Sequence, residues 1–300
     1  NHTIHVDYKM NYNRWVTDEQ IVIIDNVRDS DNSASSAASH TANAFIQAGP
    51  RQFIPWQPGE VRAAIVTCGG LCPGLNNVVQ EIFYSLYYNY GVDIIYGIRS
   101  GYRGFWQQEY QPWLRLTPEY VKDIHEQGGT CLGASRGGFD RQKIVNALEV
   151  YGINQVYIVG GDGTHRGAWE IHEECRARGL KVCVAVVPKT IDNDIGIIDR
   201  SFGFNTAVAE ARKAINSVVL EAQCTPNGIG IVKLMGRHAG YIATHATLAS
   251  RQVDMCLIPE VPFEMNGENG LLAHLHRVMD SQKNAVIVVA EGAGAELVEA

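Results

Sequence analysis

The chain has 300 residues, of which 46% are hydrophobic and 19% are charged. This is enough apolar material for two ordinary domains or one large one, and it excludes disorder or a fibrous architecture for most of the chain. Lys and Arg number 25 against 32 Asp and Glu, a formal net charge of −7. We therefore expect no nucleic-acid partner and no membrane surface, whereas local cations and backbone amides can still bind small anions.

The seven Cys are scattered, without a CxxC pair or the spacing of a metal site. We expect them to be reduced thiols in a cytosol-like compartment. The sequence starts without Met, so we expect it to be part of a longer chain. Localisation in a plastid or another organelle is therefore an alternative to the cytoplasm. No apolar run reaches the ~18 residues that cross a bilayer.

Residues 1–60 differ from the rest and are predicted to be an N-terminal extension, with a polar linker over 29–39. Beyond them, β-rich runs are predicted as strands at 62–67, 92–98, 156–159, 182–187, 229–234, 255–258 and 285–290. Amphipathic patterns between them predict helices at 75–90, 140–151, 168–178, 207–222 and 270–281. This alternation predicts an α/β fold with mostly parallel sheets, in which ligands bind at the carboxyl ends of strands.

Two predicted strands end in glycine-rich loops. Residues 68–76 read CGGLCPGLN, and the glycines and the following helix start favour a phosphate cradle, with a tight turn as the alternative. The sequence is neither a P-loop nor GxGxxG. Residues 160–164 read GGDGT, which presents the Asp162 carboxylate between glycines. Mg²⁺ bridged to phosphates suits that arrangement, because Mg²⁺ takes one or two carboxylates plus substrate oxygens.

Three further strand ends carry charged groups. Pro188–Asp194 reads PKTIDND, which offers either a pair of catalytic acids or an Asx-rich surface turn. Arg237 follows the strand at 229–234 and can clamp a phosphoryl group, while His238 beside it is expected to be structural. Glu291 follows the last strand, and Arg136 and Arg141 add cations before Asp162. Together these groups favour phosphoryl transfer, in which positioning and charge stabilisation dominate.

The motifs GGDGT, PKTIDND, GFNTA, KLMGR and AEGAG occur in an order and spacing that resembles the ATP-dependent 6-phosphofructokinases, especially the plant-type members with a long N-terminal extension. The resemblance covers residues 62–300. It implies two Rossmann-like βαβ domains that face a cleft: an ATP-binding domain over 61–204 and a sugar-phosphate-binding domain over 205–300. Family members continue well past the AEG motif, so the second domain is expected to be incomplete. A homo-oligomer, dimer or tetramer, is also implied.

The resemblance implies transfer of a phosphoryl group from Mg-ATP to the 1-hydroxyl of fructose 6-phosphate, a glycolytic step. Asp192 would be the base, Asp194 would support its loop, and Arg237 would stabilise the phosphoryl group. The residues that would bind ATP are Gly69, Arg136, Gly137, Gly161, Asp162, Gly163 and Thr164, with Asp162 also holding Mg²⁺. Those that would bind the sugar phosphate are Thr190, Ile191, Asp192, Met235, Gly236, Arg237 and Glu291.

The sequence departs from the bacterial pattern at Leu71 and Gly228, where bacterial enzymes have Asp and Arg. Two positions bear on the donor. Gly163 leaves space for the α-phosphate of ATP, whereas pyrophosphate-using relatives have Asp there. Lys189 is typical of the pyrophosphate-using type, where bacterial ATP-using enzymes have Gly. We give Gly163 more weight and predict ATP. A pyrophosphate-dependent enzyme, a kinase of the NAD or diacylglycerol type, and a non-catalytic regulatory paralogue are the alternatives.

Overall fold

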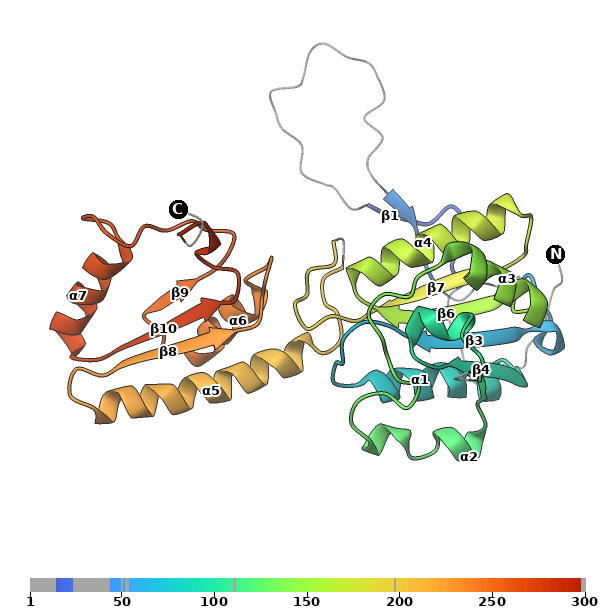
Figure 1. Cartoon of the computed structure of the whole chain (residues 1–300), viewed down its shortest axis with the longest axis horizontal. Coiled ribbons are helices and arrows are strands. Elements are labelled where there is room, and N and C mark those ends of the chain that lie inside the picture. Colours follow the sequence, from blue (N-terminus) through green and yellow to red (C-terminus); the bar gives the residue numbers. More distant parts are fainter. Residues whose placement is uncertain are drawn as a thin grey trace, which may run out of the picture.

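The fold is described from a computed structural model of the chain. It describes residues 15–23, 44–49, 51, 54–109, 112–196 and 198–297. The polar segment 29–39, predicted as a linker, lies outside these residues. Two lobes stand side by side, and the chain passes from one to the other through the segment before the long helix α5 (Figure 1).

The order of elements confirms the predicted alternation of strands and helices. The strands are β1 (Ile21–Ile23), β2 (Ala44–Ile46), β3 (Arg62–Thr67), β4 (Ile94–Ile98), β5 (Leu114–Arg115), β6 (Gln155–Gly160), β7 (Cys183–Pro188), β8 (Ile229–Leu234), β9 (Met255–Leu257) and β10 (Ala285–Ala290). The helices are α1 (Leu75–Tyr84), α2 (Pro118–Val121), α3 (Arg141–Tyr151), α4 (Asp162–Ala177), α5 (Phe204–Cys224), α6 (Tyr241–Ser250) and α7 (Leu271–Gln282).

The first lobe contains a five-stranded sheet in the order β5-β4-β3-β6-β7, parallel except for the short strand β5. Helices α3 and α4 cover one face and α1 and α2 the other (Figure 1). Alternate residues of β3 lie on opposite faces of the sheet. Ala64 and Val66 pack with α3 and α4, whereas Ala63 and Ile65 pack with α1 and α2. A strand buried on both faces explains the continuous apolar run that predicted it.

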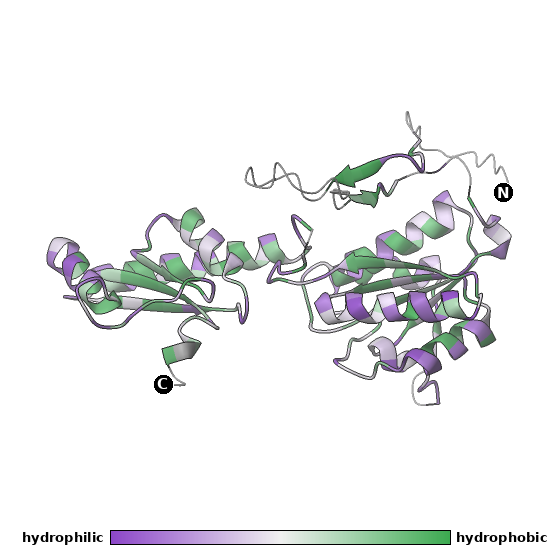
Figure 2. Ribbon diagram, turned by 90° about the horizontal axis from the view of Figure 1, so that it is seen from above, coloured by the Kyte–Doolittle hydropathy of each residue, from purple (hydrophilic) through white to green (hydrophobic). Residues whose placement is uncertain are grey.

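The second lobe has three parallel strands in the order β8-β10-β9. Its core lies between this sheet and helices α5 and α6, with Ile215 of α5 and Ala243 of α6 fully buried. The strands of both sheets are strongly hydrophobic, as Figure 2 shows. The predicted α/β class with mostly parallel sheets is therefore confirmed in both lobes. Among the described residues, no helix combines the length and the apolarity that a membrane crossing requires.

Three predicted helices have different limits in the structure. The helix predicted over 207–222 is α5, which extends from Phe204 to Cys224. Helix α4 begins at Asp162 and not at Ala168, because its first turn is made of Gly, Asp and Thr, which give no apolar periodicity. The helix predicted over 75–90 is α-helical only to Tyr84 and continues as a π-helical turn over Ser85–Asn89. The N-terminal extension also contains an antiparallel pair, β1 with β2, which the sequence pattern did not predict.

Candidate functional site

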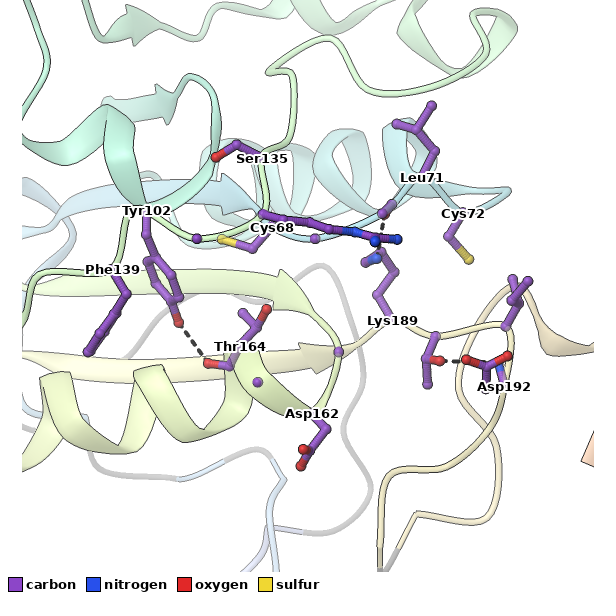
Figure 3. A pocket seen from close by; sticks show the side chains of 18 of the residues that line it. Cys68, Leu71, Cys72, Tyr102, Ser135, Phe139, Asp162, Thr164, Lys189 and Asp192 are labelled. Atoms are coloured by element: carbon purple, nitrogen blue, oxygen red, sulfur yellow. Dashed lines mark hydrogen bonds between the residues drawn. The ribbon is translucent and has the colours of Figure 1, made fainter. Parts of the chain in front are cut away.

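A cavity of about 460 Å³ lies at the carboxyl ends of β3, β6 and β7 (Figure 3). The loop after β3 supplies Cys68–Cys72, the start of α4 supplies Gly161–Thr164, and the loop after β7 supplies Lys189–Asp192. Met235 of the second lobe completes the lining. The cavity therefore lies where parallel α/β sheets bind ligands and is bounded by both lobes.

Most residues predicted for the site share this one cavity. Lining it are Gly69, Arg136, Gly137, Gly161, Asp162, Gly163, Thr164, Lys189, Thr190, Ile191, Asp192 and Met235. They come from segments more than a hundred residues apart in the chain. The structure thus brings the candidate donor-binding residues to the loop that carries the candidate base.

Two cations lie against the first glycine loop. Lys189 is 5% exposed, and its Nζ donates a hydrogen bond of 2.5 Å to the carbonyl oxygen of Gly70. A Cβ atom at Gly70 would be 3.6 Å from the Arg136 guanidinium. Burial lowers the pKa of Lys189; Cys72 and Cys68 partly offset this, and Arg136 lowers it slightly further. Within the described part of the chain neither cation has a carboxylate partner, so their charges are available to an anion.

The second glycine loop opens the amino terminus of α4 to the cavity. The N–H groups of Thr164 and His165 both donate to the Gly161 carbonyl, at 3.0 Å each. A helix amino terminus leaves its first N–H groups for a ligand. A Cβ at Gly160 would approach the Thr164 side chain to 2.4 Å, so packing requires that glycine. A Cβ at Gly163 would meet nothing within 4 Å, so the protein's own packing does not require glycine at that position.

Asp162 has the features expected of a magnesium ligand. It is the first residue of α4, its side chain is 53% exposed, and it lines the cavity. The carboxylate forms an ion pair of 2.7 Å with Arg166 one turn along the helix. No group of three metal-binding side chains occurs among the described residues. A single carboxylate completed by phosphate oxygens and water suits Mg²⁺, and the site fits that ion.

The loop after β7 is held by a set of short-range hydrogen bonds. The Thr190 hydroxyl accepts from the Asp192 N–H at 3.1 Å and donates to Asp194 at 3.3 Å. Buried Ser201 donates its hydroxyl to the Thr190 carbonyl and its N–H to the Asn193 side chain. These bonds fix the direction of Asp192 toward the cavity (Figure 3).

The Asp192 carboxylate is poised to accept a proton. Its Oδ1 atom is buried and has no hydrogen-bond partner among the described residues. Burial raises the pKa of this carboxyl, Asp194 and Glu291 raise it further, and His238 lowers it. An unpartnered buried oxygen is costly, and a hydroxyl donor or cation supplied by a ligand would satisfy it.

A second cavity of about 730 Å³ adjoins the first and shares Asp162. Asp194, His238 and Glu260 also line it, and Glu260 accepts a hydrogen bond of 2.8 Å from the Gly240 N–H at the start of α6. His238, expected from the sequence to be structural, therefore lies between the lobes and acts electrostatically on Asp192.

Three predicted residues line neither cavity. Gly236 and Arg237 follow β8, and Glu291 follows β10. Backbone hydrogen bonds of 2.9 Å join the two loops, from Glu291 N to Leu234 O and from Gly292 N to Gly236 O. The exposed Arg237 and Glu291 side chains are thus kept at the carboxyl edge of the second sheet.

The sequence reading missed some cavity residues and misplaced another. Tyr102 and Phe139 form an aromatic wall with ring centroids 5.2 Å apart, and the Tyr102 hydroxyl donates to the Thr164 carbonyl at 2.7 Å. Tyr102 follows β4 and Phe139 precedes α3; the strand-end pattern points to glycine-rich loops and charged groups, so it did not indicate these two aromatic residues. Arg141, expected to add a cation to the site, does not line the cavity and pairs with Glu174 at 3.2 Å. Burial raises the pKa of the Cys68 thiol to about 12, which leaves it uncharged.

A two-lobed α/β protein with phosphate-type anion sites at its strand ends has close counterparts among known proteins. Residues 62–299 match the family described as Phosphofructokinase, and the chain belongs to this family. It is 58% identical over 253 residues to "ATP-dependent 6-phosphofructokinase 7" of Arabidopsis thaliana, covering 84% of this chain and 52% of that protein. It is 49% identical over 265 residues to "ATP-dependent 6-phosphofructokinase" of Amycolatopsis methanolica, covering 88% and 58%.

Solved structures share the fold at lower identity. The pyrophosphate-dependent phosphofructokinase from Marinobacter aquaeolei matches with a TM-score of 0.66 and 21% identity, over 78% of this chain and 61% of that one. The phosphofructokinase from Pichia pastoris matches with a TM-score of 0.68 and 23% identity, over 81% of this chain and 27% of that one. The chain therefore has the phosphofructokinase fold and spans little more than half the length of the curated relatives it matches.

Proposed function

We propose that the protein transfers the γ-phosphoryl group of ATP to the 1-hydroxyl of fructose 6-phosphate, with fructose 1,6-bisphosphate and ADP as products. The observation that carries the proposal is the Asp192 carboxylate. It combines a buried unpartnered oxygen and a raised pKa with a position beside the Arg136–Lys189 anion site. Relatives named ATP-dependent 6-phosphofructokinase at 54–58% identity support the same reaction.

On the donor side, the protein binds and orients phosphates. Arg136 and Lys189 supply positive charge at the loop after β3, and the amino terminus of α4 supplies N–H groups. Such preorganised donors stabilise charge without reorganising during the reaction. Asp162 would hold Mg²⁺, which when bound neutralises charge on the phosphate oxygens. Gly163 keeps the space beside Asp162 free of a side chain.

On the acceptor side, Asp192 takes the proton. The 1-hydroxyl oxygen forms its bond to the γ-phosphorus while the bond from that phosphorus to the bridging oxygen of ADP breaks. The hydroxyl proton passes to Asp192, whose raised pKa makes it a stronger base than an ordinary Asp. Asp194 holds the loop through Thr190. Thr190, Ile191, Met235, Gly236, Arg237 and Glu291 would bind the sugar phosphate, and Arg237 would stabilise the group in transfer.

Pyrophosphate is the alternative donor, and Lys189 favours it because the pyrophosphate-using type is expected to have Lys at this position. A steady-state assay of the full-length protein with fructose 6-phosphate, run with ATP and with pyrophosphate in parallel, decides between them. We expect turnover with Mg-ATP and little with pyrophosphate. Turnover with pyrophosphate alone would reverse the choice of donor.

A non-catalytic paralogue that only binds these ligands is tested at Asp192. Replacing Asp192 with Ser should lower kcat by orders of magnitude and leave ATP affinity nearly unchanged, because the base is lost and the donor contacts remain. Unaltered turnover would refute the assignment of the base. No turnover by the unmodified full-length protein with either donor would favour the non-catalytic alternative.

The remaining features of the whole protein belong to the same proposal. We assign residues 61–204 to ATP binding and 205–300 to sugar-phosphate binding, with 1–60 as an extension. We propose a homo-oligomer, dimer or tetramer, as the family resemblance implies. We place the protein in the cytoplasm; among its relatives are also proteins named chloroplastic, so localisation of a fluorescent fusion of the full-length protein is the test.

A further inference from the structure

A further cavity lies at the amino-terminal edge of the five-stranded sheet, at the opposite ends of β6 and β7 from the catalytic cavity. Its volume is about 510 Å³. Gln155 and Cys183, which are register partners at the starts of β6 and β7, line it, whereas Gly160 and Pro188 pair at the catalytic ends of the same strands. Six strand residues span about 17 Å, so the two cavities are separate.

The chemistry of this cavity differs from that of the catalytic one. Among the described residues that line it, none carries a charge at neutral pH. Trp56 and Tyr157 contribute aromatic rings, and buried Leu86 and Val92 contribute aliphatic surface. A space of a few hundred Å³ with apolar and aromatic walls and few polar groups is typical of a small-molecule site.

The polar side chains that line the cavity are uncharged. The Tyr157 hydroxyl donates to Oε1 of Gln155 at 2.9 Å, and burial raises the pKa of this phenol to about 12, so it stays uncharged. The Gln155 amide N–H groups have no partner among the described residues and can donate to a ligand acceptor. A charged ligand would lose its hydration here without a compensating ion pair.

An independent feature marks the same wall. Ser85 and Leu86, the first two residues of the π-helical turn, line the cavity. The wider turn is closed by the hydrogen bond from Tyr90 N to Ser85 O at 3.1 Å, which has the i to i+5 spacing of a π-helix, and Val92 N then donates to Leu86 O at 2.9 Å beyond the turn. Single π-helical turns within helices are rare and occur often at functional sites.

We propose that this cavity, which we call the basal cavity, binds a neutral, planar aromatic molecule that carries a hydrogen-bond acceptor. The rings of Trp56 and Tyr157 contact its flat faces or edges, and the Gln155 amide donates to its acceptor. The site is distinct from the ATP and sugar-phosphate sites and needs no catalytic residue.

Prodan, a neutral naphthalene ketone whose emission shifts to shorter wavelength in apolar surroundings, is a matched probe. We expect saturable binding to the full-length protein with a blue shift that excess ATP does not reverse. Cys183 is exposed and lines the basal cavity, so Cys183→Trp would place a large ring at its opening and should weaken binding at least tenfold. Cys224→Trp places the same side chain at an exposed Cys outside the cavity and should leave binding unchanged.

A second readout uses the unmodified protein, in case the Trp variant fails to fold. The rate of alkylation of Cys183 by iodoacetamide, followed by peptide mass spectrometry, should fall at least fivefold with saturating prodan, while that of Cys224 stays constant. Absence of saturable binding, displacement by ATP, or equal protection of both thiols would overturn the proposal.

Discussion

The space at Gly163 gives the sharpest test of donor recognition. Gly163 lies in the first turn of α4 beside Asp162, and a Cβ there meets no protein atom within 4 Å. Gly163→Asp should therefore fold normally. Loss of Gly from a helix gains up to about 1 kcal/mol, and an acid near a helix amino terminus interacts favourably with the helix dipole.

The added carboxylate should nevertheless exclude ATP. A second negative charge beside Asp162 would face the α-phosphate, and two unit charges about 4 Å apart repel by about 4 kcal/mol at an effective dielectric constant near 20. We discount this to about 3 kcal/mol because Asp162 is half exposed. The corresponding loss in kcat/KM for ATP is about 100-fold or more. Pyrophosphate has no α-phosphate, so its use should not fall.

The assay is a steady-state comparison of Gly163→Asp with Gly163→Asn and Gly163→Ala, each with ATP and with pyrophosphate. Asn has the size of Asp without its charge, and Ala tests the loss of glycine alone. We expect Asp to lose far more ATP activity than Asn, with melting temperatures at or above that of the unmodified protein. Equal kcat/KM for Asp and Asn would refute the electrostatic reasoning.

Three further outcomes follow from particular contacts. The raised pKa of Asp192 means that the folded state binds its proton more tightly than the unfolded state does. This contribution to stability is present below the ordinary carboxyl pKa and is lost as pH rises through the raised value. Asp192→Asn should thus raise the melting temperature at pH 7 but not at pH 3. An equal change in melting temperature at the two pH values would contradict the raised pKa of Asp192. Gly203→Ala should cost about 2–5 kcal/mol in denaturant unfolding, because φ is +94° and a Cβ would lie 1.9 Å from Cys72 Sγ. Gly196→Ala, where a Cβ meets nothing within 4 Å, should stay within about 0.5 kcal/mol as the matched control. Lys189→Met should weaken ATP and pyrophosphate binding about tenfold by calorimetry, and unchanged affinities would contradict a phosphate role for this cation.

The parts of the fold that follow from local pattern were predictable from the sequence. β3, β8 and β10 have the predicted limits. β3 and β10 are buried in parallel sheets and read as continuous apolar runs, whereas β8 is an edge strand that is apolar although Ile229 and Ile231 are exposed. The start of α4 was not predictable from the sequence, because its first turn is glycine-rich and backbone hydrogen bonds to Gly161 fix the helix there. β1 and β2 have only three residues each, too few to show an alternating pattern.

The residues of the candidate site also divide into those that local sequence predicted and those that it did not. Residues that follow strands, such as Asp162 and Asp192, were indicated by motif and lie at the cavity. Tyr102 and Phe139 reach it by long-range packing, and the pairing of Asp162 with Arg166 depends on where α4 begins. The second cavity, with His238, depends on how the two lobes meet, which no local pattern encodes.

The two positions that bear on the donor, Lys189 and Gly163, lie in different parts of the cavity. The Lys189 side chain lies against Gly69 and Gly70 of the loop after β3, and only its backbone contacts Gly160 and Gly161. A Cβ at Gly163 would have no atom within 4 Å apart from its chain neighbours and its own helix backbone. Under the proposed function, Lys189 would supply charge to the phosphates and leave open the space that ATP would require at α4. Because the positions do not touch, Gly163→Asp and Lys189→Met should act nearly independently, with a coupling below about 1 kcal/mol in a double-mutant cycle on kcat/KM for ATP. A coupling of several kcal/mol would show that the Lys189 ammonium reaches position 163, and the choice of ATP would then lose its structural basis.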